Sequence, residues 1–247
     1  GESYGRHHSH QYGYALPTTP RQERRARKGF LVPFTDVVAP WNLTSYVFKN
    51  VFSMHVVGQP GEWCDYPLFP EIFKKAGYKV TFLTNQFLMK PAAAVFDFSG
   101  GFFLNNPTLN HAQFDLRNTA LHRYDAGLLQ DYDNFLKAGK IDLQQPNLIL
   151  FHLIGQHMNY RDRYPPERKK FTAERYERLR PELTQKQRMI LADYDNAVRY
   201  NDSIVDQICQ RFANKDAIVI YMPDHGEECY EENRGFFCRN HSAQIDW

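Results

Sequence analysis

Four neighbouring residues, Asp224-His225-Gly226-Glu227, have the side-chain types that suit metal chemistry. They follow the apolar run 217–222, AIVIYM, whose β-branched content predicts a strand. In an open α/β sheet, ligand-binding loops lie at the carboxyl ends of strands. Asp224 and His225 offer an oxygen and a nitrogen to a divalent cation, and Gly226 would let the main chain turn tightly. The alternative is a turn-capping aspartate beside a surface histidine, and these residues alone do not decide between the two.

Thr44 offers a hydroxyl at a predicted helix start, because it follows a proline-containing turn and is typical of an N-cap. The first N–H groups and the dipole of a helix attract an anion at that end. A nucleophilic hydroxyl there would meet a phosphoryl group whose charge is partly neutralised. Glu2, taken alone, is typical of a solvated carboxylate near a terminus.

Histidines follow or interrupt other elements. His157 comes after the apolar run 148–154 and is followed by polar and aromatic residues, which is typical of a strand-end loop. His152 lies inside the same run and is interpreted as a hydrogen-bonded core residue. His241 lies in a loop-like region after Cys238.

The elements that must position these residues alternate between helix and strand, which favours an α/β fold. Residues 70–77 predict a short helix ended by glycine, and residues 78–84 a strand. Residues 147–154 predict a second strand, apolar enough to be covered on both faces. Thr184 and Gln187 form a capping box before a long run of apolar residues at helical spacing. The sequence predicts one domain over residues 1–247.

Length and charge exclude some classes of protein. A chain of 247 residues can bury a sizeable core, and its net charge of +2 argues against a nucleic-acid binder. The basic run 21–28 is interpreted as a solvated surface segment, with contact to anionic lipid headgroups as the alternative. No run approaches the roughly 18 apolar residues of a membrane-spanning helix.

Four cysteines are too few for a disulfide-dense scaffold, and their spacing does not match a zinc ribbon. Cys229 and Cys238 lie in one polar stretch, so a local bridge between them is a hypothesis for an oxidising compartment. Cys209 lies on the apolar face of the long helix, and Cys64 is expected to be separate.

Several motifs together resemble a known family. The segments, in chain order, are GESYGRHHSHQYGYALPTTP, VVAPWNLTSYVF, HLIGQHMNYRDRYP, YDNAVRYNDSIVDQI and PDHGEE. Their sequences and their order resemble the catalytic domain of the phosphoethanolamine transferases, which belong to the alkaline phosphatase and sulfatase superfamily. The resemblance spans nearly the whole chain. It implies an alkaline phosphatase-like three-layer α/β sandwich with a mostly parallel central sheet.

The same resemblance implies a zinc site and a nucleophile. Matched position by position, the zinc ligands are Glu2, Thr44, Asp224 and His225. Three oxygens and one nitrogen suit zinc and are also compatible with manganese. Zinc would activate the Thr44 hydroxyl as the nucleophile. His157, and by a looser match His241, would stabilise the phosphoryl oxygens or protonate the leaving group.

The implied reaction transfers phosphoethanolamine from phosphatidylethanolamine, through a covalent intermediate on Thr44, to a cell-envelope glycolipid. The implied location is the bacterial inner membrane, with this domain facing the periplasm. Members normally have an N-terminal membrane region and a strand before the Gly-Glu motif, and they continue beyond the position of Trp247. The resemblance therefore predicts a sheet truncated at both ends, attached to the membrane through a region absent from this sequence.

Three alternatives use the same residues. A sulfatase would need a Cys/Ser-x-Pro-x-Arg motif, and the surroundings of Cys64, WCDYP, do not fit it. A phosphoglycerol transferase or phosphodiesterase would use a similar site. A non-catalytic domain that binds an envelope glycan is the third alternative, and the presence of all four predicted ligands favours an enzyme over it.

Overall fold

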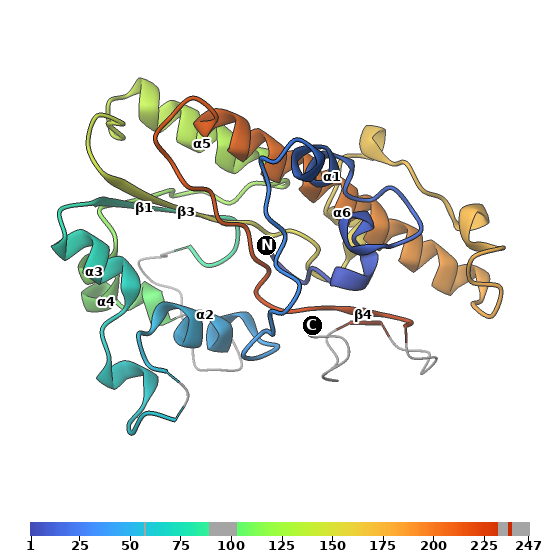
Figure 1. Cartoon of the computed structure of the whole chain (residues 1–247), viewed down its shortest axis with the longest axis horizontal. Coiled ribbons are helices and arrows are strands. Elements are labelled where there is room, and N and C mark those ends of the chain that lie inside the picture. Colours follow the sequence, from blue (N-terminus) through green and yellow to red (C-terminus); the bar gives the residue numbers. More distant parts are fainter. Residues whose placement is uncertain (57, 89–102, 232–236, 239–247) are drawn as a thin grey trace. The chain divides into compact units, whose positions relative to one another are not determined.

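The computed structural model describes residues 1–56, 58–88, 103–231 and 237–238, which form two compact units (Figure 1). The first unit combines Gly1–Asn42 with Ile154–Trp247, and the second is Leu43–Leu153. The single domain expected over residues 1–247 stays a prediction.

A parallel sheet forms the centre of the second unit. Strand β1 (Lys79–Thr84) lies between β2 (Leu116–Arg117) and β3 (Asn147–His152), and both neighbours run parallel to it. The register places Thr81 opposite Leu116 on one side and Ile149 on the other. The α/β class and the parallel sheet are therefore confirmed.

Helices cover this sheet on both sides. Figure 1 shows α5 (Ala126–Lys137) on one side and α3 (Phe69–Lys75) with α4 (Pro107–Gln113) on the other. Helix α3 ends before Gly77, whose φ of +91° is readily adopted only by glycine. The remaining helix of this unit is α2 (Thr44–Phe52).

Strand β1 is the most deeply buried part of the second unit, because every residue after Lys79 is covered. Its Val80 and Phe82 belong to an apolar cluster with buried residues from helices and loops. The other buried members are Phe52, Leu68, Leu104 and Phe114. This burial matches the continuous apolar pattern of a central parallel strand.

Strand β3 is less covered than its sequence predicts. Residues 147–151 are only half-buried, because in the described part of the chain β3 pairs with β1 alone. His152 at its end is buried, and its Nδ1 lies 3.0 Å from the hydroxyl of Thr84. The ring also packs against Phe48, with centroids 4.6 Å apart. The interpretation of His152 as a hydrogen-bonded core residue is confirmed.

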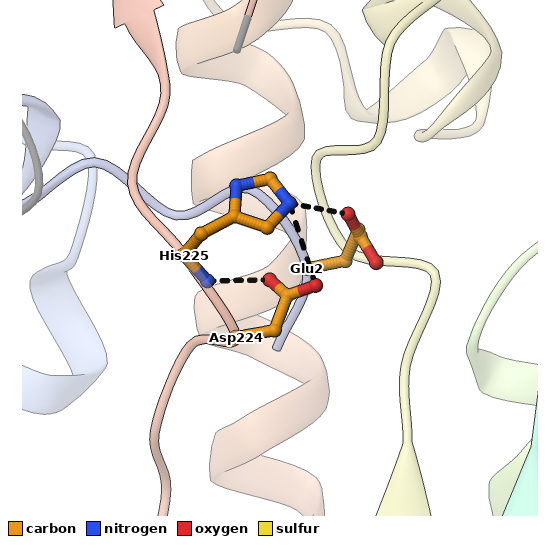
Figure 2. Close-up of side chains that lie close together, drawn as sticks. All are labelled: Glu2, Asp224 and His225. Atoms are coloured by element: carbon orange, nitrogen blue, oxygen red, sulfur yellow. Dashed lines mark hydrogen bonds and ion pairs between the residues drawn. The ribbon is translucent and has the colours of Figure 1, made fainter. Parts of the chain in front are cut away.

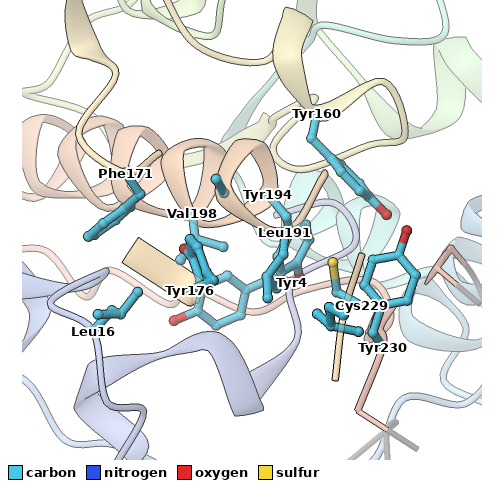
Figure 3. Close-up of a cluster of buried hydrophobic side chains, with 12 residues drawn as sticks. Tyr4, Leu16, Tyr160, Phe171, Tyr176, Leu191, Tyr194, Val198, Cys229 and Tyr230 are labelled. Carbon is cyan, nitrogen blue, oxygen red and sulfur yellow. The ribbon is translucent and has the colours of Figure 1, made fainter. Parts of the chain in front are cut away.

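The long helix α6 (Gln185–Phe212) is the main element of the first unit. Thr184 is its N-cap: the Thr184 hydroxyl accepts from the Gln187 N–H at 3.3 Å, and the Gln187 side chain accepts from the Thr184 N–H at 2.8 Å. The predicted capping box is confirmed. Helix α6 packs in a cluster of buried side chains drawn from several segments (Figure 3). Its aromatic members are Tyr4, Tyr160, Phe171, Tyr176, Tyr194 and Tyr230.

The basic run 21–28 is not simply a solvated segment. It forms most of helix α1 (Pro20–Arg27), which packs against α6. The guanidinium of Arg25 bonds the carboxylate of Asp206 at 2.7 Å, and Arg24 reaches the same carboxylate at 3.3 Å. Asp206 is almost fully buried, so these arginines neutralise a carboxylate that folding removes from water. The predicted surface segment is right for Arg24, Arg27 and Lys28, which are exposed, but it does not include this pairing with Asp206.

The predicted strand 217–222 is not a strand. The side chains of Ile218 and Ile220 are 91% and 81% exposed. No strand of the described residues pairs with this segment. Its end is held by a 2.7 Å bond from the amino group of Gly1 to the carbonyl of Met222 and by a 2.7 Å bond from the hydroxyl of Tyr221 to the side chain of Asn201. β-propensity alone does not make a strand, since the main-chain groups need a neighbouring strand for pairing.

A short antiparallel pair, β4 (Glu228–Cys229) and β5 (Phe237–Cys238), follows. The register pairs Cys229 with Phe237, and the thiol of Cys229 is free and buried. The hypothesis of a bridge from Cys229 to Cys238 is therefore wrong in this structure.

Seven single-turn 3-10 helices complete the described elements. They are Arg6–His8, His10–Tyr12, Trp63–Asp65, Phe103–Asn105, Tyr160–Asp162, Pro166–Arg168 and Ala173–Tyr176. Across the described residues, none of the helices combines the length and apolar character needed to cross a bilayer.

Candidate metal centre

Three side chains from opposite ends of the chain converge in the first unit (Figure 2). The Nε2 atom of His225 lies 3.1 Å from a carboxylate oxygen of Glu2 and 3.5 Å from one of Asp224. Glu2 and His225 are completely buried, and Asp224 is 5% exposed. In the described part of the chain, these three residues each offer one ligand atom, and the three atoms lie within 4.8 Å of one another, close enough to hold one metal ion.

A strained turn positions Glu2. Ser3 has a φ of +52°, in the left-handed region that non-glycine residues seldom adopt. Its N–H donates to Oδ1 of Asp224 at 3.0 Å, and its hydroxyl donates to Oε1 of Glu2 at 3.1 Å. Ser3 therefore ties the two carboxylates to each other as well as turning the chain.

The tautomer of His225 suits metal binding. Its Nδ1 lies 2.7 Å from the carbonyl oxygen of Gly226, which can only accept a hydrogen bond, so Nδ1 carries the hydrogen and donates. In the neutral ring, Nε2 then has a lone pair on the side of both carboxylates, where a cation can replace the proton of the charged ring. Gly226 is not in the left-handed region, and its contribution is this carbonyl; the tight turn expected around it stays a prediction. The donor set fits a divalent cation such as zinc.

The protonation of the group shows how much it favours added positive charge. Burial and the charge of Glu2 raise the pKa of Asp224 to about 7. Burial alone would lower the pKa of His225, but the charge of Asp224 and the bond to Glu2 outweigh it and raise that pKa to about 9. Burial would raise the pKa of Glu2, yet His225 and His157 together hold it well below its usual value. Without a metal, a proton on His225 neutralises part of this buried charge, and a cation would replace that proton.

The fourth residue of the motif, Glu227, has a different task. It is buried, and the hydroxyl of Tyr160 donates a short hydrogen bond to its Oε1. It is not part of the converging group, so the motif supplies two candidate ligands and one anchoring carboxylate.

The remaining predicted site residues are placed as follows. His157 is half-buried in the loop 154–157, near enough for its charge to lower the pKa of Glu2. Thr44 belongs to the second unit, where it is 4% exposed and is the first residue of α2. Leu43 is the N-cap, so the prediction of Thr44 as N-cap is wrong by one position. His241 lies outside the described residues.

Comparison with known proteins identifies the family of this chain. The sequence matches the sulfatase family over residues 1–246. The chain belongs to the sulfatase family.

Relatives of this sulfatase-family chain include phosphoethanolamine transferases. It is 29% identical over 234 residues to phosphoethanolamine transferase EptC of Escherichia coli O18:K1:H7, covering 94% of this chain and 39% of that protein. Phosphoethanolamine transferase EptA of Helicobacter pylori is 28% identical, with 94% of this chain and 42% of that protein covered. The chain therefore spans about two fifths of the length of these curated relatives.

A solved structure shares the fold of the sulfatase-family chain. The C-terminal periplasmic domain of EptC from Escherichia coli, in complex with Zn, superposes with a TM-score of 0.79 at 28% identity. The match covers 97% of this chain and 66% of that one. The soluble domain of lipooligosaccharide phosphoethanolamine transferase A from Neisseria meningitidis, 24% identical with a TM-score of 0.69, supports the fold alone.

Sequence reasoning on the sulfatase-family chain missed the residues that hold Glu2 in place. Ser3 stands inside the quoted Gly-Glu-Ser motif, but nothing in its type predicts a positive φ. Gly155 has a φ of +49°, and a Cβ there would lie 2.8 Å from the Glu2 nitrogen. Gly155 follows the apolar run 148–154, and a glycine at a strand end is the signal that could have identified a close main-chain approach.

Proposed function

We propose that this domain transfers phosphoethanolamine from phosphatidylethanolamine to a cell-envelope glycolipid, with Thr44 as the nucleophile and zinc bound by Glu2, Thr44, Asp224 and His225. The observation that carries the proposal is the buried convergence of Glu2 and Asp224 on the Nε2 atom of His225. The relatives along 94% of the chain are named as phosphoethanolamine transferases, which supports the same reaction for this chain.

Zinc is the metal that we propose for this site. The related EptC domain was solved in complex with Zn, and one imidazole with carboxylate oxygens is a donor set that zinc accepts. Manganese, which the donor set alone also allows, has no such support. Bound zinc supplies positive charge that lowers the pKa of a hydroxyl beside it.

In the first step, the hydroxyl of Thr44 loses its proton and Oγ1 forms a bond to the phosphorus of the donor lipid. The bond between phosphorus and the diacylglycerol oxygen breaks, and that oxygen takes a proton. In the second step, a hydroxyl or phosphate oxygen of the acceptor loses any proton it carries and attacks phosphorus, the bond to Thr44 breaks, and Oγ1 regains a proton. The start of α2 favours this chemistry, since the first N–H groups of a helix attract the phosphoryl oxygens.

His157 has a role at the phosphoryl group in this proposal. Its charge lowers the pKa of Glu2, which supports a place for His157 near the candidate metal centre. A histidine at this place can hydrogen-bond the phosphoryl oxygens or give the leaving oxygen its proton. His241 is proposed for the same task on the basis of the family resemblance.

The proposed setting follows from the relatives. The EptC structure is described as a C-terminal periplasmic domain, and the full-length lipooligosaccharide transferase of Neisseria meningitidis as an integral membrane protein. We place this domain in the periplasm of a bacterial inner-membrane enzyme. Transferases that act on Kdo2-lipid A are among the relatives, which supports a lipopolysaccharide-type acceptor.

Mass spectrometry of the protein after incubation with phosphatidylethanolamine tests the proposal. The wild type with zinc should carry a phosphoethanolamine adduct on Thr44, and Thr44→Ala should carry none. Ser45→Ala is the matched control, because it removes the neighbouring buried hydroxyl, and it should keep the adduct.

Three outcomes would contradict the proposal. An adduct at wild-type level in Thr44→Ala would exclude Thr44 as the nucleophile. A Thr44 adduct formed from phosphatidylglycerol but not from phosphatidylethanolamine would identify a phosphoglycerol transferase. The absence of any adduct and of any bound metal in the wild type would favour a non-catalytic binding domain.

A further inference from the structure

The first five residues are held by main-chain contacts from several segments of the first unit. The N–H of Asp224 donates to the carbonyl of Gly1 at 2.9 Å, and the N–H of Gln156 donates to the carbonyl of Glu2 at 3.0 Å. The carbonyl of Ser3 and the N–H of Gly5 remain to be bonded. Both residues are buried, so these groups need partners inside the protein.

One side chain supplies both partners. The hydroxyl of Tyr194 donates to the carbonyl oxygen of Ser3 at 2.8 Å and accepts from the N–H of Gly5 at 2.8 Å. A phenolic hydroxyl can donate one hydrogen bond and accept another, and the Tyr194 hydroxyl does both here. The hydroxyl closes the turn that carries Glu2.

The ring of Tyr194 fixes where that hydroxyl lies. Tyr194 is fully buried on α6 and belongs to the apolar cluster of the first unit (Figure 3). Its ring meets those of His8 and Tyr160 edge to face, with centroids 4.8 Å and 4.9 Å apart. Because α6 and these rings hold the side chain, its hydroxyl is a fixed point for the main chain of residues 3–5.

The turn needs such a fixed point. Ser3 adopts a φ of +52°, which residues other than glycine, asparagine and aspartate seldom adopt. A conformation of this kind persists only when the surroundings over-determine it. If the carbonyl of Ser3 were released, the main chain would relax toward negative φ and turn the carboxylate of Glu2 away from His225.

We infer that Tyr194 is a positioning residue for the metal centre, whose hydroxyl holds the Ser3 turn so that Glu2 faces Asp224 and His225. This inference rests on the metal site of the proposed function, and it is independent of the donor and the acceptor. In this inference Tyr194 is not a metal ligand; it acts through the main chain of Ser3 and Gly5, which its hydroxyl bonds.

The variant Tyr194→Phe tests the inference, because it keeps the ring and removes only the hydroxyl. Tyr164→Phe is the matched control: Tyr164 is fully buried, and its hydroxyl bonds Asp193 of α6 rather than the Glu2 turn. Zinc affinity is measured on the full chain by competition with a chromophoric chelator. Groups that orient metal ligands typically contribute 10- to 100-fold in affinity, so Tyr194→Phe should bind zinc about tenfold more weakly or worse. Tyr164→Phe should bind like the wild type.

Thermal unfolding with and without zinc separates positioning from general stability. Both variants lose one buried hydrogen-bonding group, so both should unfold at a lower temperature than the wild type without zinc. Added zinc should raise the unfolding temperature of the wild type and of Tyr164→Phe equally, and that of Tyr194→Phe by less. A Tyr194→Phe protein with wild-type zinc affinity would overturn the inference.

Ser3→Gly provides a second test, since glycine adopts positive φ without strain. If Tyr194 acts by holding this turn, removing its hydroxyl should weaken zinc binding less in a Ser3→Gly background than in the wild type. Zinc affinities of the two single variants and the double variant should therefore be non-additive, and strict additivity would contradict the inference. If the wild type itself binds no zinc, the proposed metal site fails, which is distinct from a failure of the role of Tyr194.

Discussion

Two buried clusters in the first unit contain the same residue types, one histidine and two carboxylates, in different geometry. At the candidate metal centre, Glu2 and Asp224 both approach Nε2 of His225. At the second cluster, the carboxylates of Asp195 and Glu231 lie on opposite sides of the His8 ring, at 2.7 Å from Nδ1 and 2.5 Å from Nε2. A single cation can be shared by oxygens that converge, and not by oxygens separated by a ring.

The second cluster is therefore an ion pair rather than a ligand set. The charges of Asp195 and Glu231 outweigh the opposing effect of burial and raise the pKa of His8 to about 10. The hydroxyls of Tyr14 and Tyr176 donate to the other oxygen of Asp195. Composition and burial alone do not distinguish a metal centre from a structural ion pair; the ring nitrogen that each carboxylate faces does.

The largest difference between the clusters should appear on neutralising one aspartate in each. Asp224→Asn keeps an oxygen that can accept from Ser3 and removes a ligand charge, so zinc binding should be lost. The metal-free protein should not be destabilised, because the charge of Asp224 is opposed by Glu2. Metal content after dialysis and unfolding temperature measure the two effects. Zinc retained at full occupancy would remove Asp224 from the ligand set.

Asp195→Asn should show the opposite pattern. It leaves the buried His8 without its fully buried carboxylate partner, and breaking a buried ion pair typically lowers the free energy of unfolding by about 3–5 kcal/mol. Zinc content should stay at the wild-type level. Urea unfolding measures the loss; a change below about 1 kcal/mol, typical of exposed pairs, would show that the cluster is not a structural ion pair.

The pH dependence of stability should follow His8. Its pKa in the folded protein lies above its unfolded value of about 6.5, so its contribution is complete below pH 6.5 and is lost as pH rises toward 10. Within that window the free energy of unfolding should fall by up to about 1.4 kcal/mol per pH unit from this group. The difference between the urea-unfolding pH profiles of the metal-free wild type and of His8→Gln gives the contribution of His8 alone, because His225 titrates in both proteins. Parallel pH profiles would contradict the assignment.

The smallest of these effects should come from Gly155. A Cβ there would meet the nitrogen and oxygen of Glu2 at 2.8 and 2.9 Å, so Gly155→Ala should displace Glu2 and weaken zinc binding about tenfold. Gly139→Ala is the control, because Gly139 also has a positive φ, +65°, with nothing near its Cβ position. It should cost about 1–2 kcal/mol of stability from main-chain strain and leave zinc affinity unchanged. Equal zinc affinities in the two variants would show that the contact of Gly155 with Glu2 is unimportant.

Elements with local signals could be predicted from the sequence. Thr184 and Gln187 form the expected capping box, and the apolar strand before Asn85 is β1. The candidate site could also be predicted, because the adjacent Asp224 and His225 have side chains that bind metals, and the family resemblance added Glu2. These conclusions depend on neighbouring residues or on motifs.

Features that depend on distant partners could not be predicted. The arginines of α1 look like a surface run until Asp206, about 180 positions later, is seen to pair with them. The strand expected at 217–222 fails because its pairing depends on another segment. The left-handed Ser3 owes its conformation to Asp224 and Tyr194, which no local rule connects with it.

Helix α6 has a consequence for how the chain tolerates mutation. Three of its buried polar side chains bond three different segments: Asp195 bonds His8, Asn196 bonds the main chain of Phe171, and Asn201 accepts from Tyr221. Apolar contacts survive a small slide of a helix, but hydrogen bonds of fixed length do not. The hydrogen bonds at these positions therefore fix where α6 lies along its own axis relative to the segments that it bonds. We expect evolutionary drift to exchange its aliphatic residues freely and its buried amides and carboxylates seldom.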